Sequence, residues 1–134
     1  MAYQPLPTPA SLRATAQAAA ERGQPLVVMT TLQGCVYCEL VRNSYLHPFM
    51  REGKAIAVQL DVQDRATAIQ GFDGSTTSPA SLAQAWKARF TPTVMFFGPD
   101  GRELAERLVG VASADYYGQY LEQRLETAQR AIKR

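Results

Sequence analysis

Blocks of apolar residues with strand-like or helix-like spacing divide the first half of the chain. The apolar run at 25–32 is typical of a buried strand, and residues 39–46 continue with helical spacing. A second strand is expected at 55–62. Because parallel strands need a long crossover connection, this order predicts a right-handed parallel βαβ unit.

Capping and helix-breaking residues set the expected limits of the helices. Ser11 can cap a first helix that runs to about Arg22. The helix after the first strand is expected to break near His47-Pro48, because proline disfavours helical geometry in the residue before it. Gly53 is expected to end its continuation.

The sequence of the second half of the chain predicts a connection, a helix and a hairpin. Residues 63–78 are polar and turn-rich, with room for one short helical turn. Pro79 then occupies the first position of a helix. The residues of this helix that are expected to pack on the sheet are Leu82, Ala85, Trp86 and Phe90. The apolar strand at 93–97 is followed by a tight turn at 98–101 and a returning strand at 102–110.

The last helix completes the pattern. Ser113 can cap it. Its expected apolar stripe consists of Tyr117, Leu121, Leu125, Ala128 and Ile132. The chain therefore predicts an α/β fold with a central mixed sheet, in which a parallel βαβ unit precedes an antiparallel hairpin and helices cover both faces.

Length and charge limit the possible functions. The chain has 134 residues, which suits one domain over 1–134 with residues 1–10 as an N-terminal linker. Fourteen Lys and Arg against twelve Asp and Glu leave a net charge of +2, too weak to favour nucleic acid as a partner. No stretch approaches the roughly 20 apolar residues of a membrane span.

The only two cysteines, Cys35 and Cys38, lie between the first strand and the helix that follows. Their spacing places the two sulfurs on the same side of one helical turn, within reach of a disulfide bond. At a helix start, unpaired N–H groups and the positive end of the dipole favour the reactive thiolate of Cys35. The pair can therefore cycle between dithiol and disulfide.

Three other roles compete with redox cycling. A structural zinc site needs about four Cys or His ligands, whereas the chain offers two cysteines and the distant His47. Covalent haem attachment requires histidine directly after the second cysteine, and Glu39 stands there. A purely structural disulfide remains an alternative, although so small a loop would constrain the unfolded chain little.

The cysteine motif at this junction, combined with Thr91-Pro92-Thr93 before the hairpin, resembles the thioredoxin superfamily across nearly the whole chain. By resemblance, Pro92 forms a cis peptide bond beside the disulfide, and Thr91 holds an extended substrate segment as an added strand. The substrate-binding residues that the resemblance implies are Gly34, Val36, Tyr37, Thr91 and Pro92. The segment 72–110 is most similar to exported bacterial thioredoxin-like proteins, including those associated with sulfur oxidation.

Two positions depart from the family pattern. Met29 stands where thioredoxins place a buried acid, and Gln59 stands where the lysine partner of that acid is usual. Proton handling then falls to another group, for which Glu39, Tyr37 and water are candidates. The tryptophan that is usual before the motif is also absent, with Gln33-Gly34 in its place, and Gly34 permits close approach by a partner backbone.

The resemblance implies thiol–disulfide exchange, in which Cys35 attacks a partner disulfide and Cys38 resolves the mixed disulfide. This chemistry needs no metal and no organic cofactor, and the chain contains no G-x-G-x-x-G motif for a nicotinamide or flavin. The expected partners are a protein disulfide and an upstream dithiol donor protein, and we expect a monomer. The narrower resemblance favours the periplasm over the cytoplasm, and the N-terminus itself shows no apolar signal core.

The direction of the reaction and the roles of two side chains, Phe72 and His47, remain open at this point. Because Val36-Tyr37 supplies no cation, a reductase is favoured over an oxidase or isomerase. A peptide-binding module with a structural disulfide is a further alternative. Phe72 is a candidate anchor for a partner contact, with packing beneath the connection as the competing role. His47 is expected to cap the helix or to lie on the surface.

Overall fold

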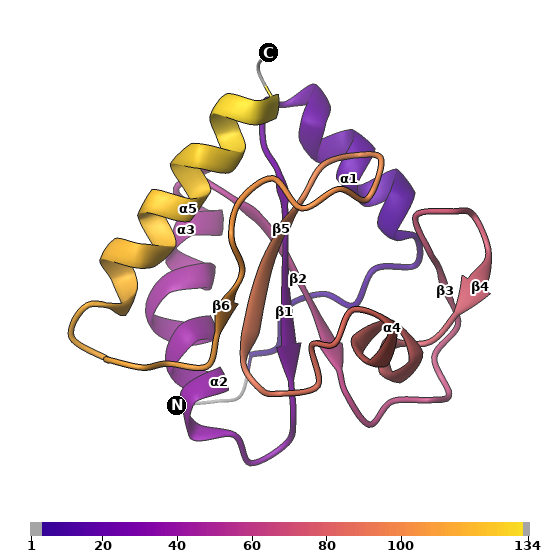
Figure 1. Ribbon diagram of the computed structural model, residues 1–134, viewed down its shortest axis with the longest axis horizontal. Coiled ribbons are helices and arrows are strands. Elements are labelled where there is room, and N and C mark those ends of the chain that lie inside the picture. Colours follow the sequence, from indigo (N-terminus) through magenta and orange to yellow (C-terminus); the bar gives the residue numbers. More distant parts are fainter. Residues whose placement is uncertain (1–3, 133–134) are drawn as a thin grey trace.

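The computed structural model, described here for residues 4–132, contains a four-stranded sheet between two layers of helices (Figure 1). The strands are β1 (Leu26–Thr31), β2 (Ile56–Asp61), β5 (Thr93–Phe97) and β6 (Leu108–Val109), in the order β2-β1-β5-β6. β1 pairs parallel with β2 and antiparallel with β5, and β5 pairs antiparallel with β6. The predicted mixed sheet is confirmed.

Side chains of β1 alternate between the two layers, as the geometry of a strand requires. Val27 and Met29 pack with α2 (Val36–Val41), α3 (His47–Arg51) and α5 (Tyr117–Ile132). Leu26 and Val28 pack with α1 (Leu12–Glu21) and α4 (Pro79–Ala85). Figure 1 shows α2, α3 and α5 on one side of the sheet and α1 and α4 on the other. We call these the α5 layer and the α1 layer.

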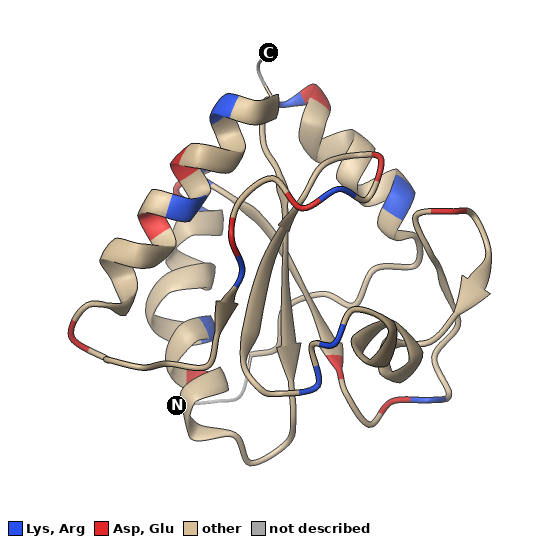
Figure 2. Ribbon diagram, in the orientation of Figure 1, with Lys and Arg blue, Asp and Glu red and all other residues tan. Residues whose placement is uncertain are grey.

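One of the two predicted helix caps, Ser11, is confirmed. The Ser11 hydroxyl oxygen accepts a hydrogen bond from the Ala14 backbone at 3.1 Å, and Ser78 caps α4 in the same way. Ser113 instead lies in a turn, and α5 begins only at Tyr117. The buried stripe of α5 consists of Tyr117, Leu121, Leu125 and Ala128. Acidic and basic residues alternate along α5 (Figure 2).

The helix after β1 does not break at His47-Pro48, contrary to the prediction. It continues from α2 through the π-helical turn η1 (Arg42–Leu46) into α3, with Pro48 in the first turn of α3. Proline clashes with the carbonyl four residues earlier, and a wider π turn moves that carbonyl away. Gly53, with φ of +71°, ends the helix as predicted. Among the described residues, no helix is long and apolar enough to cross a membrane.

The connection 63–78 contains a small antiparallel pair, β3 (Ile69–Gln70) and β4 (Thr76–Thr77), where a helical turn was expected. The turn between them is closed by the Gly71 N–H, which donates to the Ser75 carbonyl at 2.8 Å. Two glycines within a few residues favour such a tight turn over a helix.

Two other predictions in the second half need correction. The returning strand is limited to β6 and an isolated bridge between Phe97 and Glu103, beside which the Leu104 N–H donates to the Phe96 carbonyl at 2.7 Å. Phe90 does not pack on the sheet and is 67% exposed. α4 ends at Ala85, and Lys87 takes a positive φ of 56° that turns the chain away from the helix axis.

The described part of the expected linker, residues 4–10, packs along β2. Leu6 is 2% exposed, and the Gln59 backbone N–H donates to the Pro7 carbonyl at 2.9 Å. Apolar Leu6 thereby covers the edge of the α5 layer. Residues 1–3 of the expected linker lie outside the described residues.

Candidate active site

Three strand ends meet at one edge of the sheet. Thr30 near the end of β1 pairs with Thr93 at the start of β5, and Thr93 pairs with Val109 at the end of β6. The segments that extend beyond these ends therefore lie side by side. A hydrogen bond of 2.7 Å from the Gly110 N–H to the Pro92 carbonyl joins two of them.

Cys35 and Cys38 form a disulfide at the same edge, with their Cα atoms 5.2 Å apart. Cys35 is the N-cap residue of α2, and its sulfur accepts a hydrogen bond from the Cys38 backbone N–H at 3.2 Å. Cys38 is fully buried, whereas Cys35 is partly exposed. A partner can therefore reach Cys35 more readily than Cys38.

The backbone around the disulfide is open to solvent. Gly34 has φ of +82°, and nothing lies within 4 Å of the place where a Cβ would stand. Val36 and Tyr37 are 73% and 51% exposed. The loop thus presents bare backbone and two apolar side chains next to the reactive sulfur.

The segment before β5 is held in a fixed conformation. The Thr91-Pro92 peptide bond is cis, the geometry that the resemblance implies. The Thr93 hydroxyl donates to the Phe90 carbonyl at 2.6 Å, and the Thr93 N–H donates to the Thr30 hydroxyl at 3.0 Å. Pro92 is buried and Thr91 is half-buried. This segment therefore has little freedom to move.

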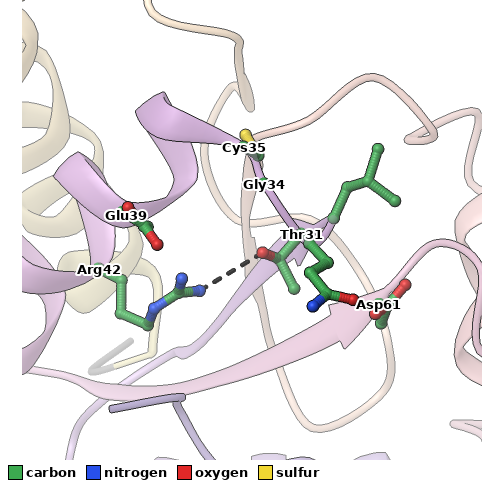
Figure 3. A pocket seen from close by; sticks show the side chains of 8 residues that line it. Thr31, Gly34, Cys35, Glu39, Arg42 and Asp61 are labelled. Atoms are coloured by element: carbon green, nitrogen blue, oxygen red, sulfur yellow. Dashed lines mark hydrogen bonds between the residues drawn. The ribbon is translucent and has the colours of Figure 1, made fainter. Parts of the chain in front are cut away.

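A cavity of about 510 Å³ opens beside Cys35. Glu39, Arg42 and Asp61 contribute charged side chains to its wall (Figure 3). Among residues 4–132, no group of three His, Cys, Asp or Glu side chains is arranged to hold a metal ion. Of the candidates for proton handling, Glu39 faces this cavity, and Tyr37 does not line it.

Arg42 is the functional candidate that the sequence reasoning missed. Its side chain is 2% exposed, and Nη1 donates to Gln59 Oε1 at 3.1 Å and to the Thr31 hydroxyl at 3.4 Å. Figure 3 shows the guanidinium pointing toward Thr31 below the disulfide loop. One signal was available, because Arg42 follows Cys38 by four residues and so lies on the same face of the helix.

Two other candidates lie away from this cavity. The ring of Phe72 packs against Phe97 and Trp86 in the α1 layer, at centroid distances of 5.1 and 6.2 Å. These contacts favour packing over recognition, and they account for the position of Trp86. His47 Nε2 forms a hydrogen bond of 2.7 Å with the backbone oxygen of Gln4, so it holds the N-terminal segment.

Solved structures share this fold at low sequence identity. Thioredoxin from Fasciola hepatica superposes with a TM-score of 0.58 at 17% identity, covering 90% of this chain and 97% of that chain. Mitochondrial thioredoxin 3 from Saccharomyces cerevisiae, in its oxidised form, gives 0.56 at 15% identity, with 90% and 93% covered. No curated protein sequence matches the chain significantly. The model of the thioredoxin-like domain matches residues 12–125, and the chain belongs to that family.

Proposed function

We propose that this protein is a thiol–disulfide oxidoreductase that reduces protein disulfides. The observation that carries the proposal is the Cys35–Cys38 disulfide at the sheet edge, with one sulfur accessible and the other buried. A disulfide with this asymmetry suits a nucleophile and a resolving thiol. Nothing in the exchange requires a metal or an organic cofactor.

The reaction transfers two electrons to the partner. The thiolate of Cys35 attacks one sulfur of the partner disulfide, which breaks that bond, forms a mixed disulfide and releases a partner thiolate. The thiolate of Cys38 then attacks the Cys35 sulfur, forms the Cys35–Cys38 disulfide and releases the second partner thiolate. Both partner thiolates take up protons from water. An upstream dithiol protein restores the reduced pair by the same exchange.

A protein partner suits the exposed apolar residues around the disulfide. Val36 and Tyr37 flank the cysteines, while Phe90 and Val109 project from the neighbouring segments and are 67% and 60% exposed. Phe90 also covers Gly110, where a Cβ would lie 2.9 Å from its ring. An extended partner segment docking along Thr91-Pro92 would contact these side chains.

Reduction of insulin by dithiothreitol, followed by turbidity, tests the proposal. The wild-type protein should accelerate precipitation, and Cys35→Ser should reduce the rate to that of dithiothreitol alone. Cys38→Ser should accumulate mixed disulfides with its partners, because it lacks the resolving thiol. A wild-type protein that does not accelerate the reaction would leave the peptide-binding module with a structural disulfide as the better reading.

One observation favours a second candidate, an oxidase or isomerase. The preference for a reductase rested on the lack of a cation between the cysteines, whereas the buried guanidinium of Arg42 faces the same cavity as Cys35. A cation near a thiolate stabilises the reduced pair and makes the disulfide more oxidising. Equilibration with a series of glutathione buffers separates the two, because an oxidase remains reduced in buffers that oxidise a reductase.

Location and assembly extend the proposal. The resemblance of segment 72–110 to exported bacterial proteins favours the periplasm, where a disulfide reductase would need a dithiol donor that is itself kept reduced. Fractionation of cells that express the full gene tests this. The protein is proposed to act as a monomer, which sedimentation equilibrium of the reduced protein would check.

A further inference from the structure

Two buried hydroxyl groups lie at the edge of the sheet where the disulfide loop begins. Thr30 stands near the end of β1 and Thr93 at the start of β5, and both side chains are buried. Burying a hydroxyl costs free energy unless it forms hydrogen bonds. Valine has nearly the same shape and would fill either position without that cost. The two hydroxyls therefore indicate a role that apolar packing does not supply.

Both hydroxyls bind the same carbonyl group, that of Phe90. The Thr93 hydroxyl donates to this carbonyl at 2.6 Å, and the Thr30 hydroxyl donates to it at 3.4 Å. The Thr30 hydroxyl oxygen also accepts the Thr93 backbone N–H at 3.0 Å. Because a hydroxyl can donate one hydrogen and accept others, the three bonds form together. They fix the backbone directly before the Thr91-Pro92 bond.

The backbone of the next residue, Thr91, has no such partner. Within residues 4–132, neither its N–H nor its C=O forms a hydrogen bond. The carbonyl after it, that of Pro92, is again occupied, by the Gly110 N–H at 2.7 Å. The polar groups available to an added strand therefore include both groups of Thr91, between two carbonyls that the protein itself occupies.

Thr30 also connects this segment to the cysteine loop. The loop leaves the end of β1, and its Cys35 N–H donates to the Leu32 carbonyl at 3.1 Å. Thr30 lies two residues before Leu32 in the chain and directly across from Thr93 in the sheet. The same strand end thus holds both the loop with Cys35 and the segment with Thr91. A partner bound to that segment is thereby placed relative to the loop.

We infer that Thr30 and Thr93 are positioning residues for disulfide exchange. Their hydroxyls hold the carbonyl of Phe90, which fixes the direction in which the polar groups of Thr91 face a partner strand. The inference rests on the proposed reduction of protein disulfides. Loss of either hydroxyl should weaken the docking of a partner segment, and it should affect the chemistry at Cys35 far less.

Steady-state reduction of insulin, with dithiothreitol as the donor, separates docking from chemistry. Thr93→Val should raise KM for insulin by up to about tenfold, the factor that corresponds to one hydrogen bond, and should change kcat much less. Thr93→Ser, which keeps the hydroxyl, should restore most of the wild-type KM. Reduction of hydroxyethyl disulfide, which is too small to pair with the backbone as a strand, should be affected much less than reduction of insulin.

Thr15→Val is the matched control, because the Thr15 hydroxyl donates to the Ser11 carbonyl at 2.7 Å in α1. It removes the same group and the same kind of bond, so it should lower the melting temperature without raising KM. A purely structural role of Thr93 would likewise lower the melting temperature and leave KM for insulin at the wild-type value. That result in a folded Thr93→Val would overturn the inference, as would a Thr93→Ser that does not restore KM.

Loss of folding in Thr93→Val does not end the test. Thr30→Val removes the other hydroxyl and should also raise KM, and Thr30→Ser should restore it. In the wild type, the Thr93 amide should exchange its hydrogen slowly, because it donates to a buried hydroxyl. Exchange as fast as at the exposed Arg89 would overturn the inference without any variant. A wild type inactive on insulin would remove the proposed function and the inference together, whereas an active wild type with unchanged KM in the valine variants would remove the inference alone.

Discussion

The two layers that cover the sheet are held together by different contacts. In the α1 layer, Phe72, Trp86 and Phe97 form a cluster of aromatic rings with centroid distances of 4.8 to 6.2 Å. In the α5 layer, the buried Arg42 forms hydrogen bonds with Gln59 beneath the disulfide. Burying a charge costs free energy unless hydrogen bonds compensate. The comparison teaches that, among the described residues, the buried charge lies in the layer that also contains the cysteines.

A second buried polar group belongs to the same layer. The Tyr117 side chain packs against Tyr45 with ring centroids 5.8 Å apart. Burial, with a smaller contribution from Tyr45, raises the pKa of the Tyr117 hydroxyl above its usual value. This hydroxyl therefore stays neutral in any ordinary buffer. Among the described residues, Arg42 is then the one buried charged side chain of this layer.

The largest expected effect tests whether the aromatic cluster contributes to the stability of the fold and not to the activity. Phe72→Ala should lower the free energy of unfolding by roughly 3 kcal/mol, the lower end for a buried phenylalanine, because Phe72 is half-buried. Urea denaturation of the purified variant measures this. Insulin reduction by the folded fraction should be unchanged.

Phe90→Ala is the matched control, because it removes the same ring from an exposed position at the site. Its cost should stay below about 0.5 kcal/mol, whereas its effect should appear in turnover of protein disulfides. Equal loss of stability in the two variants would break the distinction between a packing layer and a functional edge.

A smaller effect is expected at Gly101, which faces the same cluster. A Cβ at this position would lie 2.8 Å from Phe72 Cγ, and the backbone φ of +85° is unfavourable for any other residue. Gly101→Ala should therefore cost about 2 kcal/mol in unfolding free energy.

Gly53→Ala separates the two causes of that loss. Gly53 has a similar φ of +71°, but nothing lies within 4 Å of its added Cβ. It should cost only about 1 kcal/mol, the backbone part of the penalty. Similar denaturation midpoints for the two variants would show that the contact with Phe72 contributes nothing.

The smallest effect concerns the polar connection 63–78. The Thr67 hydroxyl donates to the Asp64 carboxylate at 2.6 Å, and this bond, with the Thr67 backbone N–H, holds the pKa of Asp64 below its ordinary value. A lowered native pKa adds stability above the unfolded value of about 3.9 and loses it as the pH falls through the native value.

Asp64→Asn and Thr67→Val should therefore both show a slightly smaller drop in melting temperature between pH 7 and pH 3 than the wild type. Asp64 lies near the surface, where water weakens such interactions, so the change should be small. A drop identical to that of the wild type in both variants would mean that this hydrogen bond does not affect stability.

Features set by local chemistry were predictable from the sequence. Ser11 caps α1 because its hydroxyl accepts a backbone bond three residues away, and the cysteine spacing requires only one helical turn. The apolar run at 93–97 predicted a strand buried on both faces, and all five residues of β5 are buried. Each of these features depends on residues close together in the chain.

Features set by distant contacts were not predictable. In the sequence alone, Arg42 resembles a solvated helix residue. In the structure it is hydrogen-bonded to Gln59, which is seventeen residues away. Phe90 fits the spacing of α4, but the positive φ of Lys87 turns the chain away from the helix axis before Phe90 is reached. The π turn at 42–46 likewise results from fitting Pro48 into a helix whose two ends are fixed by packing.

The side-chain oxygen of Gln59 accepts hydrogen bonds from two separate segments. One donor is the backbone N–H of Leu6, at 3.0 Å, and the other is Arg42. The residues before α1 and the guanidinium below the disulfide therefore share a single acceptor. Removal of Leu6 would therefore take away one of the two described donors to the oxygen that also holds Arg42, beside the cavity that Cys35 lines.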